Sequence, residues 1–249
     1  MSIGRHAVDL GRRGRHVVKV TLPFVGMMIG LFAPAGVQSR GSFAIPAETP
    51  KSPTSGDVDT ASSRVYIYVP KAGLGHDHAI EGKLKSGRLQ LGEAQDAGEL
   101  LFDMSSFDAD TAAARRYIGL PGATDAGTRR EVNANMLGAD VLSVRRFPTA
   151  TFAITSAELS NQPGRRGAVY QLTGKFTLHG TTRALTVNAE AEKVDGRIHV
   201  KGKFPLVQTH YGIQPFTKAF GAVGVANQLT VHADLWIADK PSENKGATP

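Results

Sequence analysis

The segment from residue 168 to residue 194 constrains the fold most, because two alternating runs flank a short polar turn. Before the turn at His179-Gly180 the large apolar residues fall mainly on even-numbered positions, and after it they fall on odd-numbered positions. These residues are Tyr170, Leu172, Phe176, Leu178, Leu185, Val187, Ala189 and Ala191. A period of two is typical of a strand with one buried face. The segment therefore predicts an antiparallel hairpin whose apolar face is covered.

Strand patterns recur along the chain and predict an all-β domain. They cover residues 64–70, 79–91, 98–104, 150–159, 168–178, 183–194, 197–206 and 224–237, with a break at Ser86-Gly87 in the second. An up-and-down barrel and a sandwich both accommodate about eight such strands. We favour the antiparallel barrel, because long strands with short connections at Gly180 and Asp195-Gly196 suit pairing between sequence neighbours.

A short helical insertion is expected between residues 106 and 140. Thr128 and Glu131 have the spacing of a capping box, Val132 and Met136 share one helix face, and Gly138 predicts a left-handed stop. This helix is expected to lie across the barrel or to close one end of it. A shorter helix is expected near residues 108–116, where Asp108 and Asp110 are available for capping.

The first 35 residues have the layout of a signal peptide. Basic residues between Arg5 and Lys19 precede an apolar run at 20–32 and the small-residue sequence Ala33-Pro34-Ala35. We therefore expect a periplasmic or secreted protein, with an uncleaved N-terminal anchor as the alternative. Residues 36–62, rich in Pro, Ser, Thr and Gly, predict a disordered linker. Residues 63–238 then form one barrel domain, and 239–249 a flexible tail.

Charge and composition exclude several classes of function. The formal net charge is +7, but without residues 1–35 it falls to +3, from 24 basic and 21 acidic residues. No basic stripe interleaved with aromatic residues remains, so we expect no nucleic-acid partner. Cysteine is absent, which excludes disulfides, thiolate metal sites and a cysteine nucleophile. No Gly-x-Ser-x-Gly, His-Glu-x-x-His or phosphate-binding glycine loop occurs, and we expect no enzyme.

The inward face of the predicted barrel combines apolar side chains with small ones. Assigning the apolar parity inward places these residues there: Leu172, Gly174, Phe176, Leu185, Val187, Ala189, Ala191, Ile198, Val200, Gly202, Phe204, Leu229, Val231, Ala233 and Leu235. An eight-stranded barrel is wide enough to be filled by side chains or to hold one ligand. A hollow interior implies an apolar guest. The alternative is a solid core, completed by Phe102, Met104, Phe152, Ile154 and the helix.

Three segments carry a family resemblance: residues 135–152 (Asn-Met-Leu-Gly-Ala-Asp-Val-Leu leading to Arg-Phe-Pro-Thr-Ala-Thr-Phe), residues 173–183 (Thr-Gly-Lys-Phe-Thr-Leu-His-Gly-Thr-Thr-Arg) and Tyr211-Gly212-Ile213. In this order they resemble the YceI-like lipid and polyisoprenoid-binding family of exported bacterial proteins. The resemblance implies a lipocalin-like antiparallel β-barrel that holds a long isoprenoid or fatty chain in an elongated apolar cavity. Gly75-His76-Asp77-His78 departs from many relatives and indicates a subgroup containing His-Asp-His.

The residues expected to bind such a ligand are the larger residues of the inward face together with Phe152, Tyr211 and Arg183. The larger inward residues are Leu172, Phe176, Leu185, Val187, Ile198, Val200, Phe204, Leu229, Val231 and Leu235. Tyr211 belongs to a loop expected over one end of the barrel, where it touches the guest or simply packs. The guanidinium of Arg183 is suited to a diphosphate head group, although such an arginine is more often solvated.

His76 and His78 are candidate metal ligands, because residues two apart on a strand project to the same face. Two ligands are too few for zinc, so an aspartate or another histidine among His179, His199, His210 and His232 has to complete the site. The alternative is a polar turn, or hydrogen bonding to the head group of a guest at the mouth of the barrel.

These observations favour an exported carrier of a long-chain lipid or polyisoprenoid, without a resident cofactor. Contact with a membrane surface and a homodimer are its expected associations. Two alternatives stay open at this point: a metal-dependent hydrolase centred on His76 and His78, and a filled barrel that acts as an envelope stress or interaction protein.

Overall fold

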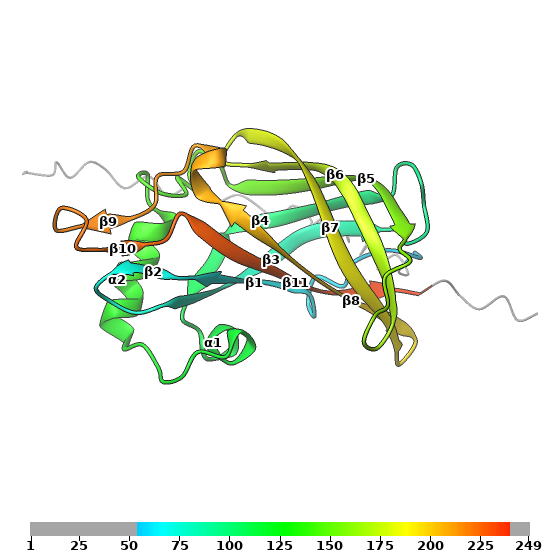
Figure 1. Cartoon of the computed structure of the whole chain (residues 1–249), viewed down its shortest axis with the longest axis horizontal. Coiled ribbons are helices and arrows are strands. Elements are labelled where there is room, and N and C mark those ends of the chain that lie inside the picture. Colours follow the sequence, from blue (N-terminus) through cyan, green and yellow to red (C-terminus); the bar gives the residue numbers. More distant parts are fainter. Residues whose placement is uncertain (1–53, 240–249) are drawn as a thin grey trace, which may run out of the picture. The chain divides into compact units, whose positions relative to one another are not determined.

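A closed antiparallel β-barrel of eight strands forms the part of the chain that the computed structural model describes, residues 54–239 (Figure 1). The order around the barrel is β1-β11-β8-β7-β6-β5-β4-β3. Its strands are β1 (Arg64–Val69), β3 (His78–Leu89), β4 (Gly98–Ala109), β5 (Thr149–Leu159), β6 (Ala168–Leu178), β7 (Thr181–Val194), β8 (Arg197–Val207) and β11 (Gln228–Ala238). The prediction of a barrel rather than a sandwich is confirmed. The predicted signal peptide lies outside the described residues.

The two predicted tight turns connect neighbouring strands. Leu178 pairs with Thr181, so the β6–β7 turn contains only His179 and Gly180, with φ values of 51° and 75°. Asp195 and Gly196 connect β7 to β8 with φ values of 49° and 74°. Positive φ at both central residues is the requirement of a two-residue hairpin turn of type I′, and a glycine in the second position meets it without strain.

The predicted last strand is divided in two. Val223–Val225 form β10, which pairs with β2 (Lys71–Gly73) and β9 (Thr217–Lys218) in a separate three-stranded sheet. The barrel strand β11 begins only at Gln228. Between them, Asn227 accepts the backbone N–H of Gln208 and donates a side-chain hydrogen bond to Thr209. These contacts with the 3-10 helix η1 (Gln208–Tyr211) turn the chain.

Both expected helices exist, with different ends from those predicted. In α2 (Ala126–Leu137) the N-cap is Asp125, whose carboxylate accepts the N–H groups of Gly127 and Thr128. Thr128 is therefore inside the first turn and does not cap. The predicted left-handed stop is also wrong, because Gly138 is extended, with φ −66°. Neither helix of residues 54–239 is long and apolar enough to cross a membrane.

The shorter helix, α1 (Ala112–Ile118), is capped by Thr111. Asp108 and Asp110 take no part in that cap, because β4 continues to Ala109. Asp108 instead forms an ion pair with Arg129 of α2 and accepts a hydrogen bond from Asn133. These polar contacts attach α2 to the end of β4. Helix α2 lies at the same end of the barrel as β2, β9 and β10 (Figure 1).

Residues before Ser63 already belong to the packed structure. Asp57 and Val58 form isolated bridges with Arg88 and Ile237. Asp59 accepts a hydrogen bond from the Arg197 guanidinium at 2.9 Å. Val58 also packs against the hydrophobic core. The sequence predicted a disordered linker up to residue 62. Residues 57–59 of that segment are instead held by contacts with the barrel.

Candidate functional site

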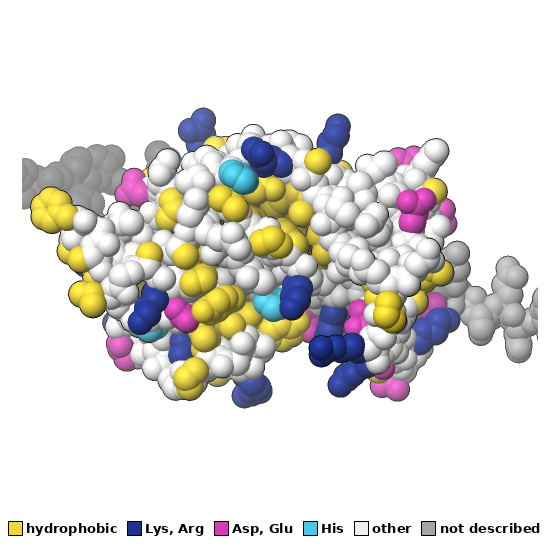
Figure 2. All heavy atoms as spheres, in the orientation of Figure 1, with side chains coloured by type: hydrophobic (Ala, Val, Ile, Leu, Met, Phe, Trp, Pro, Cys, Tyr) yellow, Lys and Arg dark blue, Asp and Glu magenta, His cyan; other side chains and the backbone are white. Residues whose placement is uncertain are grey.

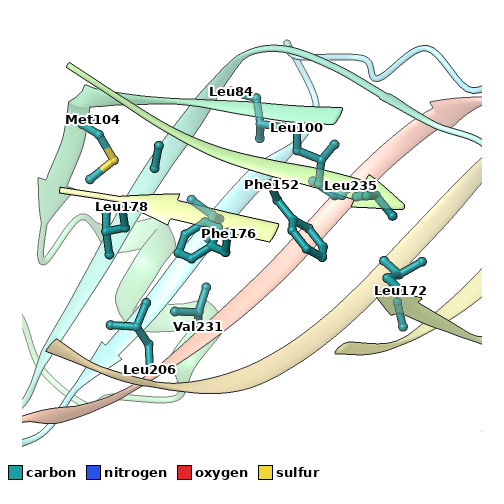
Figure 3. Packing of buried hydrophobic residues seen from close by; sticks show 14 of the residues in the cluster. Leu84, Leu100, Met104, Phe152, Leu172, Phe176, Leu178, Leu206, Val231 and Leu235 are labelled. Atoms are coloured by element: carbon teal, nitrogen blue, oxygen red, sulfur yellow. The ribbon is translucent and has the colours of Figure 1, made fainter. Parts of the chain in front are cut away.

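The barrel encloses a cavity of about 620 Å³. Its wall is made of inward side chains from β1, β3 to β8 and β11, and apolar groups dominate it. Figure 3 shows Phe152, Phe176, Leu178, Leu206 and Val231 directed into the space between the strands. Because alternate residues of a strand face opposite sides, the period-two pattern of the sequence produces this wall directly.

Several aromatic rings pack against one another in the cavity wall. The ring of Phe176 packs edge-on against Phe102, Phe152 and Phe204, with centroid distances of 6.4, 6.4 and 6.1 Å. Such edge-to-face packing keeps the rings in fixed positions. Ala189 and Gly202 lie in the same wall and contribute almost no side-chain volume. The interior is consequently hollow, and the large residues that favoured a solid core, such as Phe102 and Met104, line the cavity instead of filling it.

Not every inward glycine contributes to the hollow. A Cβ on Gly174 would lie 2.1 Å from the backbone oxygen of Ala153, so the backbone of β5 occupies the space that a side chain would need. The register of β5 and β6 shifts at this point, between Ile154 and Ser156. A bulge brings the two backbones close and makes glycine necessary. Gly174 is thus a small residue of the predicted inward face that does not widen the cavity.

Helix α2 and the sheet β2-β10-β9 form one end of the cavity. Val132 and Met136 of α2 contribute apolar side chains to the wall, as do Val223 of β10 and Leu74, which directly follows β2. The two elements are joined by an ion pair between Lys218 and Glu131, at 3.2 Å. Of the two predicted positions of the helix, across the barrel or at one end of it, the structure shows the second. Figure 2 shows hydrophobic side chains exposed on one face of the molecule, with Lys and Arg side chains spread around them.

His76 and His78 lie in the wall of the same cavity, beside the carboxylate of Asp110. His78 begins β3 and Asp110 follows β4, and the pairing of Ile80 with Ala109 brings the two strand ends together. His78 Nδ1 is 2.8 Å from Asp110 Oδ2, and His76 Nε2 is 3.7 Å from the same oxygen. The rings of His76 and His78 are neighbours, with centroids 4.5 Å apart.

Asp110 is the anchor of this cluster. Its side chain has no exposed area, and its Oδ1 accepts hydrogen bonds from the Ala79 N–H and the Arg115 guanidinium, both at 3.1 Å. Thr124 donates to Oδ2 at 2.9 Å. Burial on its own raises the pKa of Asp110, but hydrogen bonds from His78, Ala79 and Thr124 outweigh it and hold the pKa well below its usual range. The carboxylate is therefore ionised.

The comparisons with known proteins agree with this barrel. A family model described as a YceI-like domain matches residues 57–236. The chain belongs to the YceI-like family. A search of the curated proteins finds no match.

The chain is also similar to solved structures of low sequence identity. A polyisoprenoid binding domain from Saccharophagus degradans, described as implicated in plant cell wall breakdown, is 13% identical, with a TM-score of 0.50 over 74% of this chain and 98% of its own. Burkholderia cenocepacia BcnA is 17% identical, with a TM-score of 0.48 over 73% of this chain and 100% of its own. The YceI protein of Campylobacter jejuni is 11% identical, with a TM-score of 0.43 over 64% and 85%.

The YceI-like barrel brings most of the expected ligand-binding residues into one wall. Those that line the cavity are Leu172, Phe176, Leu185, Val187, Val200, Phe204, Leu229, Val231, Leu235 and Phe152. The structure places three others away from that wall. Ile198 lies near the end of β8 that pairs with the end of β11, opposite Ile237. Tyr211 is buried behind Phe176, at a centroid distance of 5.7 Å, where burial raises its pKa. Arg183 is exposed and donates to the carbonyl of His210 at 3.4 Å.

Parts of the YceI-like cavity were not identified from the sequence. They are the inward residues Val65, Ile67 and Val69 of β1, Ile80 of β3, Leu100 and Phe107 of β4, and the residues of the small sheet. The alternation in β1 carries the same signal as that in β6 and would have found its three residues. The residues of the small sheet carry no such signal. They reach the cavity only because β2, β9 and β10 fold over its end.

Of the six histidines that the metal hypothesis named, only His76 and His78 share a site in the described residues. His199 pairs with Asp234 at 2.6 Å, His232 packs against Tyr117, and His179 packs against Phe147. His210 is exposed in η1. The third group beside His76 and His78 is Asp110, which is 32 residues away from His78 in the sequence.

Proposed function

We propose that this protein is an exported binding protein that holds a long isoprenoid or fatty chain in its cavity. The observation that carries the proposal is the hollow, apolar interior of a closed barrel, about 620 Å³ in volume. Burial of each methylene contributes about 0.8 kcal/mol, so a long chain binds tightly with few polar contacts. The Saccharophagus degradans relative, described as polyisoprenoid binding, supports the same class of ligand. Binding rather than catalysis is the proposed activity.

Export is supported by the sequence of the leader, with its basic start and its apolar run before Ala33-Pro34-Ala35. The proposed location is the periplasm or the extracellular medium. A carrier there meets its ligand in a membrane, because long apolar chains are scarcely soluble in water.

The proposed site of exchange with a membrane is the end formed by α2 and the small sheet. Leu74 lines the cavity and is also 69% exposed. Phe220, which follows β9, is fully exposed. Lys71 and Lys218 of the same sheet are exposed and carry the charge that favours an anionic lipid surface. Apolar side chains beside the cavity, framed by lysines, suit a surface that takes a chain out of a bilayer.

The deciding experiment introduces a bulky side chain into the cavity. Ala189 is buried on the inward face of β7, so Ala189→Phe introduces a ring into the space proposed for the ligand. We expect affinity for a fluorescent long-chain lipid to fall at least about tenfold, which corresponds to about 1.4 kcal/mol. Ala184→Phe, at an exposed position of the same strand, is the matched control and should bind as the unchanged protein does.

Native mass spectrometry of the unchanged protein, extracted gently from its host, should show an added lipid mass. A second inward variant, Ala233→Phe, guards against a local failure to fold, and thermal unfolding checks all three variants. If Ala189→Phe and Ala233→Phe bound the lipid as tightly as the control Ala184→Phe, the cavity would not be the binding site.

A further inference from the structure

The cluster at the cavity wall has the composition of a metal site. In the described residues, His76, His78 and Asp110 are the one group of at least three potential ligands whose donor atoms all lie within 4.8 Å of one another. Two imidazoles and one carboxylate form a donor set that suits zinc and neighbouring divalent transition metals. We propose that His76, His78 and Asp110 bind one divalent transition-metal ion, with Zn²⁺ as the ion to test.

The two distances to Asp110 are close to those that a bound ion requires. A tetrahedral ion with bonds of about 2.0 Å holds its ligand atoms about 3.3 Å apart. His78 Nδ1 and Asp110 Oδ2 are 2.8 Å apart, and His76 Nε2 and the same oxygen are 3.7 Å apart. Both distances differ from the tetrahedral edge by about half an ångström. Rotation of the partly exposed His76 ring adjusts the second, and loss of the direct His78–Asp110 hydrogen bond opens the first.

The surroundings of Asp110 hold its carboxylate in the orientation that a metal needs. Arg115 and the Ala79 N–H both bind Oδ1, which leaves Oδ2 directed at the two histidines. Thr124 supports Oδ2 from the side. Groups that orient a ligating carboxylate in this way raise metal affinity, because the ion does not have to order its own ligand.

The ion also has a path to the site. The His76 side chain is 48% exposed, so the position is open to solvent, while His78 and Asp110 are largely covered. Three protein ligands leave at least one coordination position for water or another oxygen. His76 and His78 line the cavity, so this open position lies beside the space proposed for a lipid. An oxygen of the lipid's polar end is the expected fourth ligand, and that step alone rests on the proposed function.

A second histidine–aspartate pair in the same barrel provides an internal control. His199 Nε2 and Asp234 Oδ1 are 2.6 Å apart, closer than His78 and Asp110. His199 stacks on Trp236 at 4.0 Å, and no third metal ligand joins the pair among residues 54–239. If hydrogen bonding explained both pairs, the two sites would respond alike to metal. The proposal predicts that only the site with His76 does.

The test is calorimetric titration of the full chain, stripped with a chelator, with Zn²⁺. We expect one ion per chain, at least tenfold weaker binding in His76→Ala and in His78→Ala, and no binding in the double variant. His199→Gln should bind as the unchanged protein does. Co²⁺ should give visible ligand-field absorption that the double variant lacks, which reports coordination without depending on activity.

Asp110→Asn is expected to weaken zinc binding as well, but it also disturbs the contacts with Arg115, so His76→Ala carries the decision. Absence of heat with the unchanged protein, or a stoichiometry that survives in the double variant, would overturn the metal site. Lipid affinity is measured separately on the metal-free protein. Loss of one property without the other therefore distinguishes failure of the metal proposal from failure of the proposed lipid function.

Discussion

Gly174 and Gly202 both occupy inward positions of barrel strands, yet their surroundings differ. A Cβ on Gly174 would meet the backbone oxygen of Ala153 at 2.1 Å. A Cβ on Gly202 would meet the side chains of Val187 and Ala189 at 3.2 and 3.3 Å. Backbone atoms in a paired strand cannot retreat without breaking ladder hydrogen bonds, whereas side-chain ends shift by a few tenths of an ångström.

This contrast predicts different costs for the same substitution. Gly174→Ala should lower the free energy of unfolding by about 2 kcal/mol or more, as overpacking of a rigid site does. Gly202→Ala should change it by less than about 1 kcal/mol, because the reduced freedom of the unfolded chain offsets a mild contact. Urea denaturation of both variants gives the comparison. Equal losses would mean that the β5 backbone is not the obstacle at Gly174.

Single residues also show how far the sequence could predict the site. Alternation identified Leu185, Val187 and Val200 as wall residues because parity decides which face of a strand a side chain occupies. Arg183 has the same parity as Leu185 but lies near the end of β7, so parity alone could not reveal that it stays in solvent. Asp110 was not identified as the partner of His78, because strand pairing over 32 residues creates that contact.

The elements themselves were predicted well where the pattern is long and periodic, and less well where tertiary contacts decide. Strands β6 and β8 begin at their predicted residues, and the tight turns follow from His179-Gly180 and Asp195-Gly196. The break between β10 and β11 has no glycine or proline and depends on contacts of Asn227 with η1. The start of α2 was misplaced because Asp125 competed with Thr128 for the cap and binds two backbone N–H groups.

Helix α1 is attached to the outside of the barrel by an aromatic cluster. Tyr117 of α1 stacks on Tyr66 of β1 at a centroid distance of 4.0 Å and packs edge-on against His232 of β11 at 5.9 Å. Burial, followed by the Asp234 carboxylate, raises the pKa of Tyr117, so its hydroxyl stays protonated. The ring of His232 is therefore part of the contact that holds α1 on the barrel.

The protonation of His232 is expected to make stability depend on pH. Burial, and after it the positive charge of Lys203 on β8, lowers the pKa of His232 below its usual value of 6.5. The folded protein thus favours the neutral ring. The resulting stabilisation is complete above the pKa of the unfolded chain and is lost as pH falls through the lower pKa of the folded state. We expect the free energy of unfolding to decrease on acidification below about pH 6.5.

Replacement of the ring isolates this contribution. In His232→Gln the loss of stability between about pH 7 and pH 5 should be smaller than in the unchanged protein, because the titrating group is gone. His210→Gln, at an exposed histidine, is the control for the removal of an imidazole as such. Urea unfolding at a series of pH values gives the slopes. A slope unchanged by His232→Gln would contradict the assignment.

At the scale of the whole barrel, polar and apolar groups are distributed unevenly around the cavity. The end with α2 and the small sheet combines the exposed Leu74 and Phe220 with lysines and with the histidine cluster. Leu159 is exposed to a similar extent, 65%, but it does not line the cavity. If exposed apolar side chains had no role in lipid exchange, substitutions at Leu74, Phe220 and Leu159 would have the same effect on it.

Transfer of lipid from vesicles tests whether they are equivalent. The double variant Leu74→Ser and Phe220→Ser should take a fluorescent long-chain lipid from anionic vesicles several times more slowly than the unchanged protein. Its equilibrium affinity should change little, because most of the cavity wall is intact. Leu159→Ser should transfer at the original rate. High salt should slow transfer in all three proteins, because each keeps Lys71 and Lys218 and their attraction to the vesicle is screened. Equal rates in all three proteins would rule out this end of the barrel as the place of exchange, since removal of its two most exposed apolar side chains would then have left membrane contact unaffected.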